Sequence, residues 1–244
     1  MKSVQVCLSP ALLPFYELDD AVAVVIDIFR ASSSICYGLA NGAKAIIPVA
    51  DLDECLPYRG NGCLVAAERN GEVVEGFDFG NSPFSYTKEN IAEKTVVLTT
   101  TNGTQAIRRC LAAKRVVIGS FLNITTLSDW LRKQDHPILL VCSGWKNHFS
   151  LEDTVFAGAV VNRLKTDGTV IDDAAQAAES LYLEARGDLA TYLRKSSHHQ
   201  RMQRLHIEQD IAFCLREDLV SVIPVLEGKE LVCLNEPAAP VGRP

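Results

Sequence analysis

The amino-acid sequence predicts an α/β protein with a mostly parallel or mixed central sheet and helices on both of its faces. Short apolar runs of strand length alternate with patterns of helix length over the first two thirds of the chain. Strands that alternate with helices form parallel sheets whose two faces the helices cover. The chain of 244 residues is also long enough to bury the core of one large domain.

Each predicted element is bounded by residues typical of its ends. Apolar runs predict strands over 4–8, 22–27, 44–49, 63–67, 95–100, 115–119 and 137–142. Helices are predicted over 31–41, 104–113 and 124–133, which end at Gly42, at Lys114-Arg115 and before Pro137. The glycine-rich segment 71–85 is too long for an ordinary connection, and loops of that kind are often functional.

The last third of the chain changes character. Residues 150–215 are mainly helical in pattern, with helices over 152–164, over 173–185 and around 207–215, and strands follow over 222–226 and 230–234. The proline-rich segment 236–244 is predicted to be a disordered tail. We expect a single α/β domain over 1–235 with a helical segment in its C-terminal third. Two closely packed subdomains that split near 145–170 are the alternative.

Composition narrows the function. Apolar residues make up 48% and charged residues 22% of the chain, and the longest apolar runs have strand length, so neither disorder nor a membrane span is expected. A formal net charge of −6 argues against a nucleic-acid surface. The N-terminus enters a strand pattern without a signal-peptide core, which predicts a cytoplasmic protein. The eight cysteines lie singly, as buried free thiols do, and a homodimer is the expected assembly.

The most informative stretch runs from Val24 to Ser34. A buried apolar strand delivers Asp27 and Arg30 to a helix start that is rich in serine hydroxyls. A carboxylate can hold Mg²⁺ or attack phosphorus, a guanidinium grips phosphate or sulfonate with a fork of donors, and a helix N-terminus favours anions. The pattern indicates chemistry on a small molecule with two anionic groups. A helix cap at Asp27 with Arg30 as its surface partner is the alternative.

Several other apolar runs also end in small or polar residues. They lead into Thr99 to Thr104, into Gly119-Ser120 and into Cys142-Ser143-Gly144. The carboxyl ends of the strands line the ligand crevice of open α/β sheets. We therefore expect these segments to converge on one site.

The order of these motifs resembles the 2-phosphosulfolactate phosphatase family, often called ComB. The motifs that carry the resemblance cover nearly the whole chain: Asp27-Ile28-Phe29-Arg30-Ala31-Ser32-Ser33-Ser34, Ala40-Asn41-Gly42-Ala43, Glu68-Arg69-Asn70-Gly71, Gly76-Phe77-Asp78-Phe79-Gly80-Asn81-Ser82-Pro83, Leu98-Thr99-Thr100-Thr101-Asn102-Gly103-Thr104, Gly119-Ser120-Phe121-Leu122-Asn123 and Phe149-Ser150-Leu151-Glu152-Asp153-Thr154. Two positions depart from the family pattern. Serines occupy 32–34 in place of threonine-rich residues, and His206 stands where a glycine is expected.

The resemblance implies a three-layer α/β/α fold and a Mg²⁺-dependent phosphatase. The implied reaction converts (R)-2-phospho-3-sulfolactate to 3-sulfolactate and phosphate, a step toward coenzyme M. The family also occurs where coenzyme M is not made, so another small phosphorylated hydroxy acid is an alternative substrate. A non-catalytic anion-binding protein is a third hypothesis, and it predicts the loss of an essential acidic group.

Four acidic side chains are the candidates for metal and nucleophile. Asp27 is the first choice, as a Mg²⁺ ligand and as the nucleophile, with a metal-activated water equally open; Glu68 follows as a catalytic and metal residue. Glu152 and Asp153 complete the predicted ligand set, although acidic residues also favour the first turn of a helix for its dipole alone. Mg²⁺ often binds only one or two carboxylates, so not all four are expected to bind directly.

Basic and small polar side chains supply the predicted anion contacts. Arg30 is a catalytic and Arg69 a substrate-binding candidate because guanidinium forks match tetrahedral oxyanions, with an ion-pair role as the alternative. The run Thr101-Asn102-Gly103-Thr104 resembles an anion cradle, in which Gly103 permits close backbone approach. Weaker substrate contacts are predicted at Asn81, Ser120, Asn123 and Ser143. A surface or packing role is favoured for His148, His198, His199 and His206.

Overall fold

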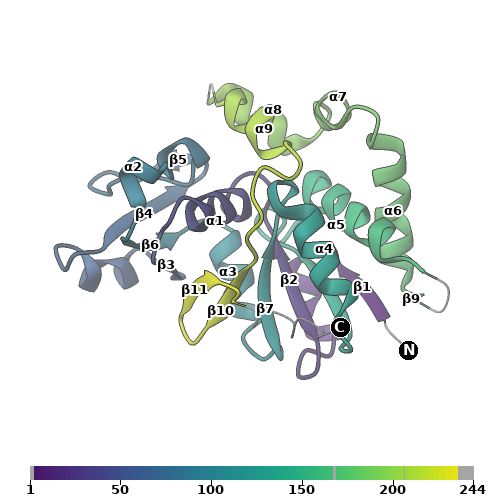
Figure 1. The fold of residues 1–244 in the computed structure, drawn as a ribbon. Coiled ribbons are helices and arrows are strands. Elements are labelled where there is room, and N and C mark those ends of the chain that lie inside the picture. Colours follow the sequence, from purple (N-terminus) through teal and green to yellow (C-terminus); the bar gives the residue numbers. More distant parts are fainter. Residues whose placement is uncertain (1–2, 167–168, 206, 236–244) are drawn as a thin grey trace, which may run out of the picture.

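The structure, a computed structural model, describes residues 3–166, 169–205 and 207–235. The predicted tail 236–244 and the unusual His206 lie outside these residues. The strands in chain order are β1 (Ser3–Cys7), β2 (Val22–Ile26), β3 (Ala45–Pro48), β4 (Leu64–Arg69), β5 (Glu72–Val73), β6 (Thr95–Thr99), β7 (Arg115–Gly119), β8 (Ile138–Cys142), β9 (Val170–Ile171), β10 (Pro224–Glu227) and β11 (Glu230–Cys233). They form one sheet in the order β5-β4-β6-β3-β11-β10-β7-β2-β8-β1-β9 (Figure 1).

Helices cover both faces of this sheet. They are α1 (Ala31–Ala40), α2 (Lys88–Ile91), α3 (Gly103–Arg109), α4 (Ile124–Arg132), α5 (Leu151–Leu164), α6 (Asp173–Ala185), α7 (Leu189–Leu193), α8 (Ser197–Arg204) and α9 (Glu208–Cys214). Short 3₁₀ segments lie at Pro10–Phe15, Asp53–Tyr58, Pro83–Ser85 and Phe121–Asn123. No helix in the described ranges is long and apolar enough to cross a membrane.

The side chains of β2 show how three layers form. Val22, Val24 and Ile26 pack into one core with α4, α5 and α6. Ala23 and Val25 pack into the opposite core with α1 and α3. Successive side chains of a strand point to opposite faces, and a strand covered on both faces is apolar throughout. The predicted three-layer α/β/α architecture is confirmed.

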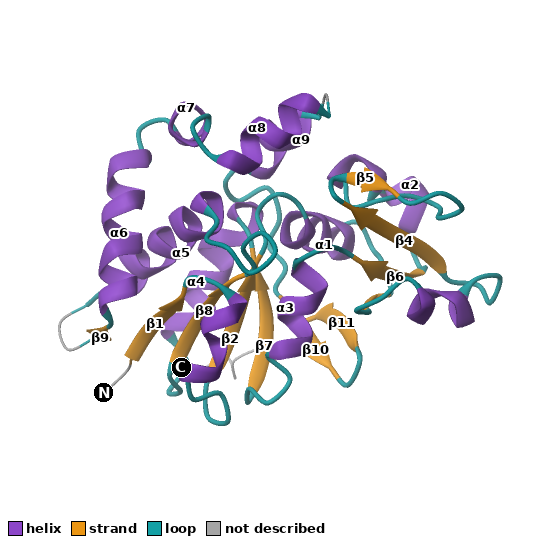
Figure 2. Ribbon diagram, turned by 180° about the vertical axis from the view of Figure 1, so that it is seen from behind, coloured by secondary structure: helices purple, strands orange, loops and turns teal. Residues whose placement is uncertain are grey.

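The sheet consists of two parallel blocks. One contains β4, β6 and β3, and the other contains β7, β2, β8, β1 and β9. The antiparallel hairpin β10–β11 lies between them, pairing with β7 on one side and with β3 on the other. Figure 2 shows the block with β4 and β6 turned sideways relative to β1, β2, β7 and β8. Residues that follow strands of both blocks can therefore line one pocket.

Most predicted elements are observed. The strands agree with the predicted ranges within two residues at each end. α3 ends at Arg109 and not at 113, because the chain leaves the helix through a turn in which Ala113 N donates to Cys110 O at 2.8 Å. The short β5, β9, α2 and α7 were not predicted, nor was α8. Its sequence is mostly polar and buries only His199 and Met202, so no apolar periodicity marks it.

Candidate active site

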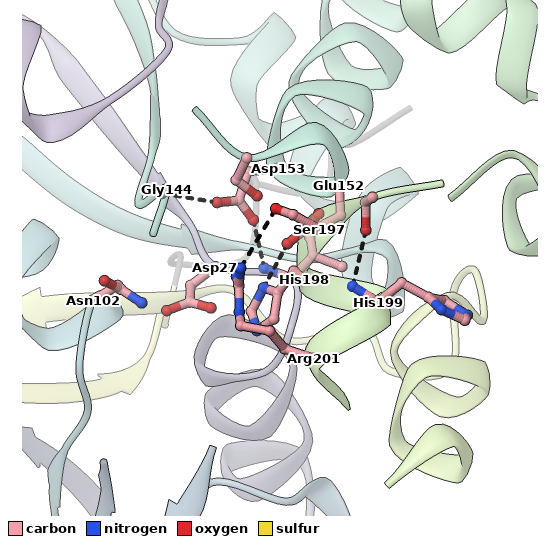
Figure 3. Close-up of polar contacts among 12 residues, drawn as sticks. Asp27, Asn102, Gly144, Glu152, Asp153, Ser197, His198, His199 and Arg201 are labelled. Atoms are coloured by element: carbon pink, nitrogen blue, oxygen red, sulfur yellow. Dashed lines mark hydrogen bonds and ion pairs between the residues drawn. The ribbon is translucent and has the colours of Figure 1, made fainter. Parts of the chain in front are cut away.

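A narrow pocket lies where the carboxyl end of β2 meets α8. Its lining comes from strand ends and from α8, and includes Asp27, Arg30, Glu68, Asn81, Asn102, Trp145, His198 and Arg201. Figure 3 shows Asp27, which follows β2, together with His198 and Arg201 of α8 and the neighbouring Glu152 and Asp153 of α5. About 20 Å³ is open to the centres of water molecules, which is the room of one or two waters.

Serine hydroxyls fix the turn from β2 into α1. Ser32 Oγ accepts from Asp27 N at 3.1 Å and donates to Asp27 O at 2.8 Å. Ser33 Oγ donates to a carbonyl of the same turn at 3.1 Å, and Ser34 Oγ donates to Asn81 O at 2.5 Å. Two of the hydroxyls predicted to lie beside an anion, those of Ser32 and Ser33, therefore hold the turn that carries Asp27, and that of Ser34 holds the segment at Asn81.

Asp27 is buried, and charged side chains surround it. Burial raises the pKa of its carboxyl to about 6; His198 opposes this rise, and the charges of Glu68 and Glu152 add to it. Perturbed carboxyls in clefts are typical of sites where protonation or charge changes during a reaction. Asp27 is thus the carboxyl of this pocket best suited to take part in the chemistry.

Gly103 lets the start of α3 approach Asp27. A Cβ at this position would lie 2.6 Å from Asp27 Oδ2 and 2.7 Å from Ala31 Cβ. These separations are shorter than real Cβ contacts, so the close approach depends on glycine. Gly103 therefore permits a close backbone approach as predicted, but the group that it approaches is the Asp27 side chain, and Gly103 itself lies outside the described lining.

We expect Gly103→Ala to lower kcat/KM by at least about tenfold, because the new methyl group displaces Asp27 from its working position. Both kcat/KM and Tm are measured beside Gly187→Ala, where an added Cβ meets no atom within 4 Å. A Gly103→Ala enzyme as active as wild type would show that the close approach does not position Asp27.

Glu68 ties together the loops that follow β4 and β6. Its carboxylate accepts from Gly71 N, from Thr101 N at 3.3 Å and from Thr101 Oγ1 at 3.4 Å. Thr101 Oγ1 in turn accepts from Asn70 N at 3.2 Å. Glu68 lines the pocket, but both of its oxygens already have protein donors.

Asp153 joins two strand ends behind the pocket. Its Oδ1 accepts from Ile28 N at 2.9 Å and its Oδ2 accepts from Gly144 N at 3.0 Å. Burial raises the pKa of Asp153 well above its usual range, and the charges of Glu152 and Asp27 add to the rise. Its backbone contacts show that Asp153 positions the loop after β2, which carries Asp27.

Glu152 pairs with a histidine from α8. Its Oε1 lies 2.7 Å from His198 Nδ1, and its Oε2 is buried with no hydrogen-bond partner among the described residues. Burial acts to raise the pKa of Glu152, but the hydrogen bond and charge of His198 outweigh it and the pKa is lowered. The contact at Nδ1 leaves His198 Nε2 as the ring nitrogen that can serve a substrate.

The sequence favours a surface or packing role for His198, whereas the structure places it in the pocket. Its ring lies edge-on to Phe29, with centroids 5.9 Å apart, and tilted on Trp145 at 5.5 Å. The signal in the sequence is the spacing of His198 and Arg201, which puts both on one face of a helix. His148 is exposed and His199 is buried outside the lining.

The two predicted anion-gripping arginines are engaged by the protein itself. Arg30 Nη1 pairs with Asp210 on α9 in a buried ion pair, and Arg30 Nη2 donates to Gly71 O at 2.8 Å. Its ionic partner is thus Asp210 and not Asp27, which the sequence offers as the alternative partner. Arg69 lies outside the lining, and its Nη1 donates to Glu68 O at 2.8 Å.

Several predicted substrate contacts hold backbone instead. Thr104 Oγ1 accepts from Thr100 N at 3.1 Å. Ser120 and Asn123 form a capping box, in which Ser120 N donates to Asn123 Oδ1 at 3.0 Å. Ser143 is buried beside the end of β2. These four lie outside the described lining. The side chains of Thr104, Ser120 and Asn123 satisfy local backbone groups at strand–helix junctions, whereas the buried Ser143 Oγ has no hydrogen-bond partner among the described residues.

Two predicted asparagines do reach the pocket. Asn81 is buried, and its Oδ1 has no hydrogen-bond partner in the part of the chain that the structure describes. Asn102 lies before α3, where its Oδ1 accepts from Lys146 N at 2.9 Å. These two asparagines add amide groups to a lining that also contains acidic and basic side chains.

The carboxylates in and beside the pocket fit only a sparsely held Mg²⁺ ion, with Asp27 in the lining and Glu152 outside it. Among the described residues, no group of three or more His, Cys, Asp and Glu side chains is arranged to hold a metal. Mg²⁺ needs only one or two carboxylates besides waters and substrate oxygens. Glu152 Oε2 lacks a partner and Asp27 is crowded by like charges, so these are the oxygens that a cation would satisfy. A cage of four carboxylates does not fit, since backbone amides occupy Glu68 and Asp153.

Size alone does not locate this site. A larger hollow of about 970 Å³ is lined by residues that include Leu13, Tyr16 and Arg109. It contains none of the residues predicted for catalysis or binding. The site is defined by the chemistry of its side chains.

Strand ends that gather carboxylates, amides and arginines in one pocket are typical of the ligand crevice of an α/β protein. The sequence profile described as 2-phosphosulpholactate phosphatase matches residues 7–229. The chain belongs to this family, as its motifs predict.

Similar proteins cover nearly the whole chain. A protein of Thermotoga petrophila named probable 2-phosphosulfolactate phosphatase is 43% identical over 215 residues, which are 88% of this chain and 93% of the relative. A protein of Gloeobacter violaceus with the same name is 41% identical over 226 residues, or 91% of this chain and 94% of the relative. One from Clostridium botulinum strain Eklund 17B, also so named, is 33% identical over 221 residues, covering 88% and 92%.

Proposed function

We propose that the protein hydrolyses (R)-2-phospho-3-sulfolactate to 3-sulfolactate and phosphate. The observation that carries the proposal is that Asp27 and His198 line one pocket, with Glu152 holding His198 from outside the lining. The names of the relatives supply the substrate. Such an ester carries phosphate, sulfonate and carboxylate groups, and the arginines of the lining supply the opposite charge.

Asp27 and His198 have complementary roles in this proposal. Asp27 either attacks phosphorus to form an aspartyl phosphate, which water then hydrolyses, or orients the attacking water. In both routes the bond from phosphorus to the substrate oxygen breaks, and the departing alkoxide needs a proton. Protonated His198 donates that proton from Nε2, while Glu152 holds Nδ1 and stabilises the charged ring.

Mg²⁺, when bound, would neutralise phosphate charge as the transition state forms. Asp27 and Glu152 Oε2 are the groups that we propose to hold it. Glu68 and Asp153 act around them by fixing the loops that carry Thr101 and Asp27. In this proposal two carboxylates, those of Asp27 and Glu152, bind the metal, and the other two position the loops.

We expect purified protein to release phosphate from synthetic 2-phospho-3-sulfolactate in Mg²⁺. Excess EDTA should reduce the rate at least about 100-fold, and added Mg²⁺ should restore it, because the carboxylates alone leave the phosphate charge unneutralised. The Asp27→Asn protein, purified in the same way, controls for contaminating phosphatases.

Each other result has a defined meaning. Release that survives EDTA would contradict the metal requirement. Release from 2-phospholactate or phosphoglycerate, but not from phosphosulfolactate, would move the substrate to another phosphorylated hydroxy acid. Binding without release of phosphate from any of the three would favour an anion-binding protein.

A further inference from the structure

We propose that Arg201 is the residue that receives a second oxyanion of the substrate, its sulfonate or its carboxylate, and so selects esters with more than one anionic group. The inference rests on the proposed function and deepens it. Arg201 lies on α8, which the sequence did not reveal as a helix, and it lines the same pocket as Asp27 and His198.

The guanidinium of Arg201 has an unused edge. Its Nε and Nη2 are both buried, and neither has a hydrogen-bond partner within the described ranges. Nη1 makes a long contact of 3.4 Å to Ser197 Oγ. Nε and Nη2 lie on one edge of the planar group, which is the edge that binds two oxygens of a carboxylate or sulfonate at once. Buried donors without partners are rare in folded proteins, so an unmet edge beside a pocket points to a ligand.

The other arginines near the pocket are already committed. Arg30 donates to Asp210 and Gly71 through its two terminal nitrogens. Arg69 is outside the lining. Among Arg30, Arg69 and Arg201, only Arg201 both lines the pocket and keeps two adjacent donors for a substrate.

Contacts with neighbouring side chains orient Arg201. Its guanidinium carbon lies 4.1 Å from the centroid of the Trp145 ring, a cation–π contact that holds the plane. Burial lowers the pKa of Arg201, but the charge of Glu152 opposes this, and arginine remains protonated in proteins. Figure 3 shows Arg201 beside His198.

The position of Arg201 relative to His198 separates it from the phosphate. The proposed role of His198 places the ester oxygen at this ring. Residues three apart on a helix are neighbours. A substituent two or three bonds beyond the ester oxygen then lies on the side of Arg201, while the phosphate lies toward Asp27. Sulfonate and carboxylate share the needed chemistry, a negative charge spread over at least two oxygens.

Four esters distinguish the two anions. 2-Phospho-3-sulfolactate carries both, 2-phospholactate carries only the carboxylate, 2-(phosphooxy)ethanesulfonate carries only the sulfonate, and phenyl phosphate carries neither. For Arg201→Gln we expect the kcat/KM ratio of phosphosulfolactate to phenyl phosphate to fall about 10- to 100-fold, mainly through KM, since a charge-assisted contact is lost. If 2-phospholactate shows the same fall, Arg201 binds the carboxylate. If 2-(phosphooxy)ethanesulfonate shows it, Arg201 binds the sulfonate.

Two variants guard against a structural effect. Arg201→Lys keeps the charge but loses the fork, so we expect it to recover only part of the ratio. Arg204→Gln removes the same charge from an exposed position of α8 and should keep the wild-type ratio. An Arg201→Gln ratio equal to that of wild type, or equal losses on all four esters, would overturn the proposal.

A binding measurement separates this inference from the proposed function. Titration of 3-sulfolactate, followed by calorimetry and by tryptophan fluorescence, to which Trp145 in the pocket contributes, needs no turnover. Weakened binding in Arg201→Gln would support the Arg201 site even if wild type hydrolysed none of the esters. Hydrolysis by wild type with a ratio and a binding constant unchanged in Arg201→Gln would leave the function standing and remove the site.

Discussion

Asp27→Asn is expected to reduce phosphate release at least about 10⁴-fold and, at the same time, to stabilise the metal-free protein. The loss of activity follows from removing the group that attacks phosphorus or orients the attacking water. The gain in stability follows from burial, which raises the pKa of this carboxyl from 3.8 to about 6. A rise of this size means that the ionised carboxyl destabilises the folded state by roughly 1–3 kcal/mol. The neutral amide of asparagine has no such cost.

The stability gain has a defined dependence on pH. Above about pH 6 the buried Asp27 is charged in the folded protein, so wild type bears the full penalty there. Between that pH and 3.8 the folded state binds the proton more tightly than the unfolded state, and the free energy of unfolding therefore rises as the pH falls. Below 3.8 both states are protonated and the penalty is gone.

Urea unfolding of wild type and Asp27→Asn in EDTA at pH 8, 6 and 4 measures this effect. We expect the difference in unfolding free energy to be largest at pH 8 and to have lost most of its size at pH 4, just above 3.8. Asp135→Asn, at an exposed position outside the pocket, should follow wild type at every pH. Either an active Asp27→Asn enzyme or an equal stability at pH 8 would contradict the environment that the structure gives this carboxyl.

Local sequence signals were sufficient for the framework that carries Asp27. The run Val22–Ile26 is apolar because both faces of β2 are covered, and the first polar residue after it is the carboxyl that enters the pocket. Glu68 follows the same rule at the end of β4. Gly103 marks the one position where α3 approaches Asp27 too closely for a side chain. Each of these signals lies within a few residues of the feature that it predicts.

The remaining features depend on contacts between distant segments. Polar residues at strand ends are visible in the sequence, but Ser120 bonds its neighbouring backbone while Asn81 reaches the pocket, and local spacing does not distinguish the two. The hairpin β10–β11 inserts between two blocks that precede it in the chain. α8 brings His198 and Arg201 to the site without the apolar pattern that reveals a packed helix.

The same limit applies to Arg30, whose partner Asp210 is 180 residues away. We expect Asp210→Ala to lower the free energy of unfolding by about 3–5 kcal/mol, because it leaves a buried guanidinium without its counter-charge. The exposed fractions of the two side chains are only 7% and 2%. Ser82 Oγ, which donates to Asp210 at 3.0 Å, also loses its acceptor. Urea unfolding measures the loss.

A matched control and a double variant locate the cause. Glu217→Ala breaks the more exposed pair with Arg163 and should change stability by no more than about 1 kcal/mol. Arg30→Met combined with Asp210→Leu replaces the buried pair by apolar groups and should recover most of the lost stability. Asp210→Ala within about 1 kcal/mol of wild type would show that water reaches and solvates the Arg30 guanidinium.

Activity then separates two functions of Arg30. The pair fastens α9 to the turn after β2, and α8 lies directly before α9 in the chain, so Asp210→Ala should also lower kcat/KM by at least about tenfold through a displaced His198. If Arg30 served only this attachment, the stable double variant would regain activity along with stability. Since Arg30 Nη2 also holds the backbone of Gly71, which lines the pocket, we expect stability to return with only part of the activity, which would assign the guanidinium a second role in positioning the pocket wall.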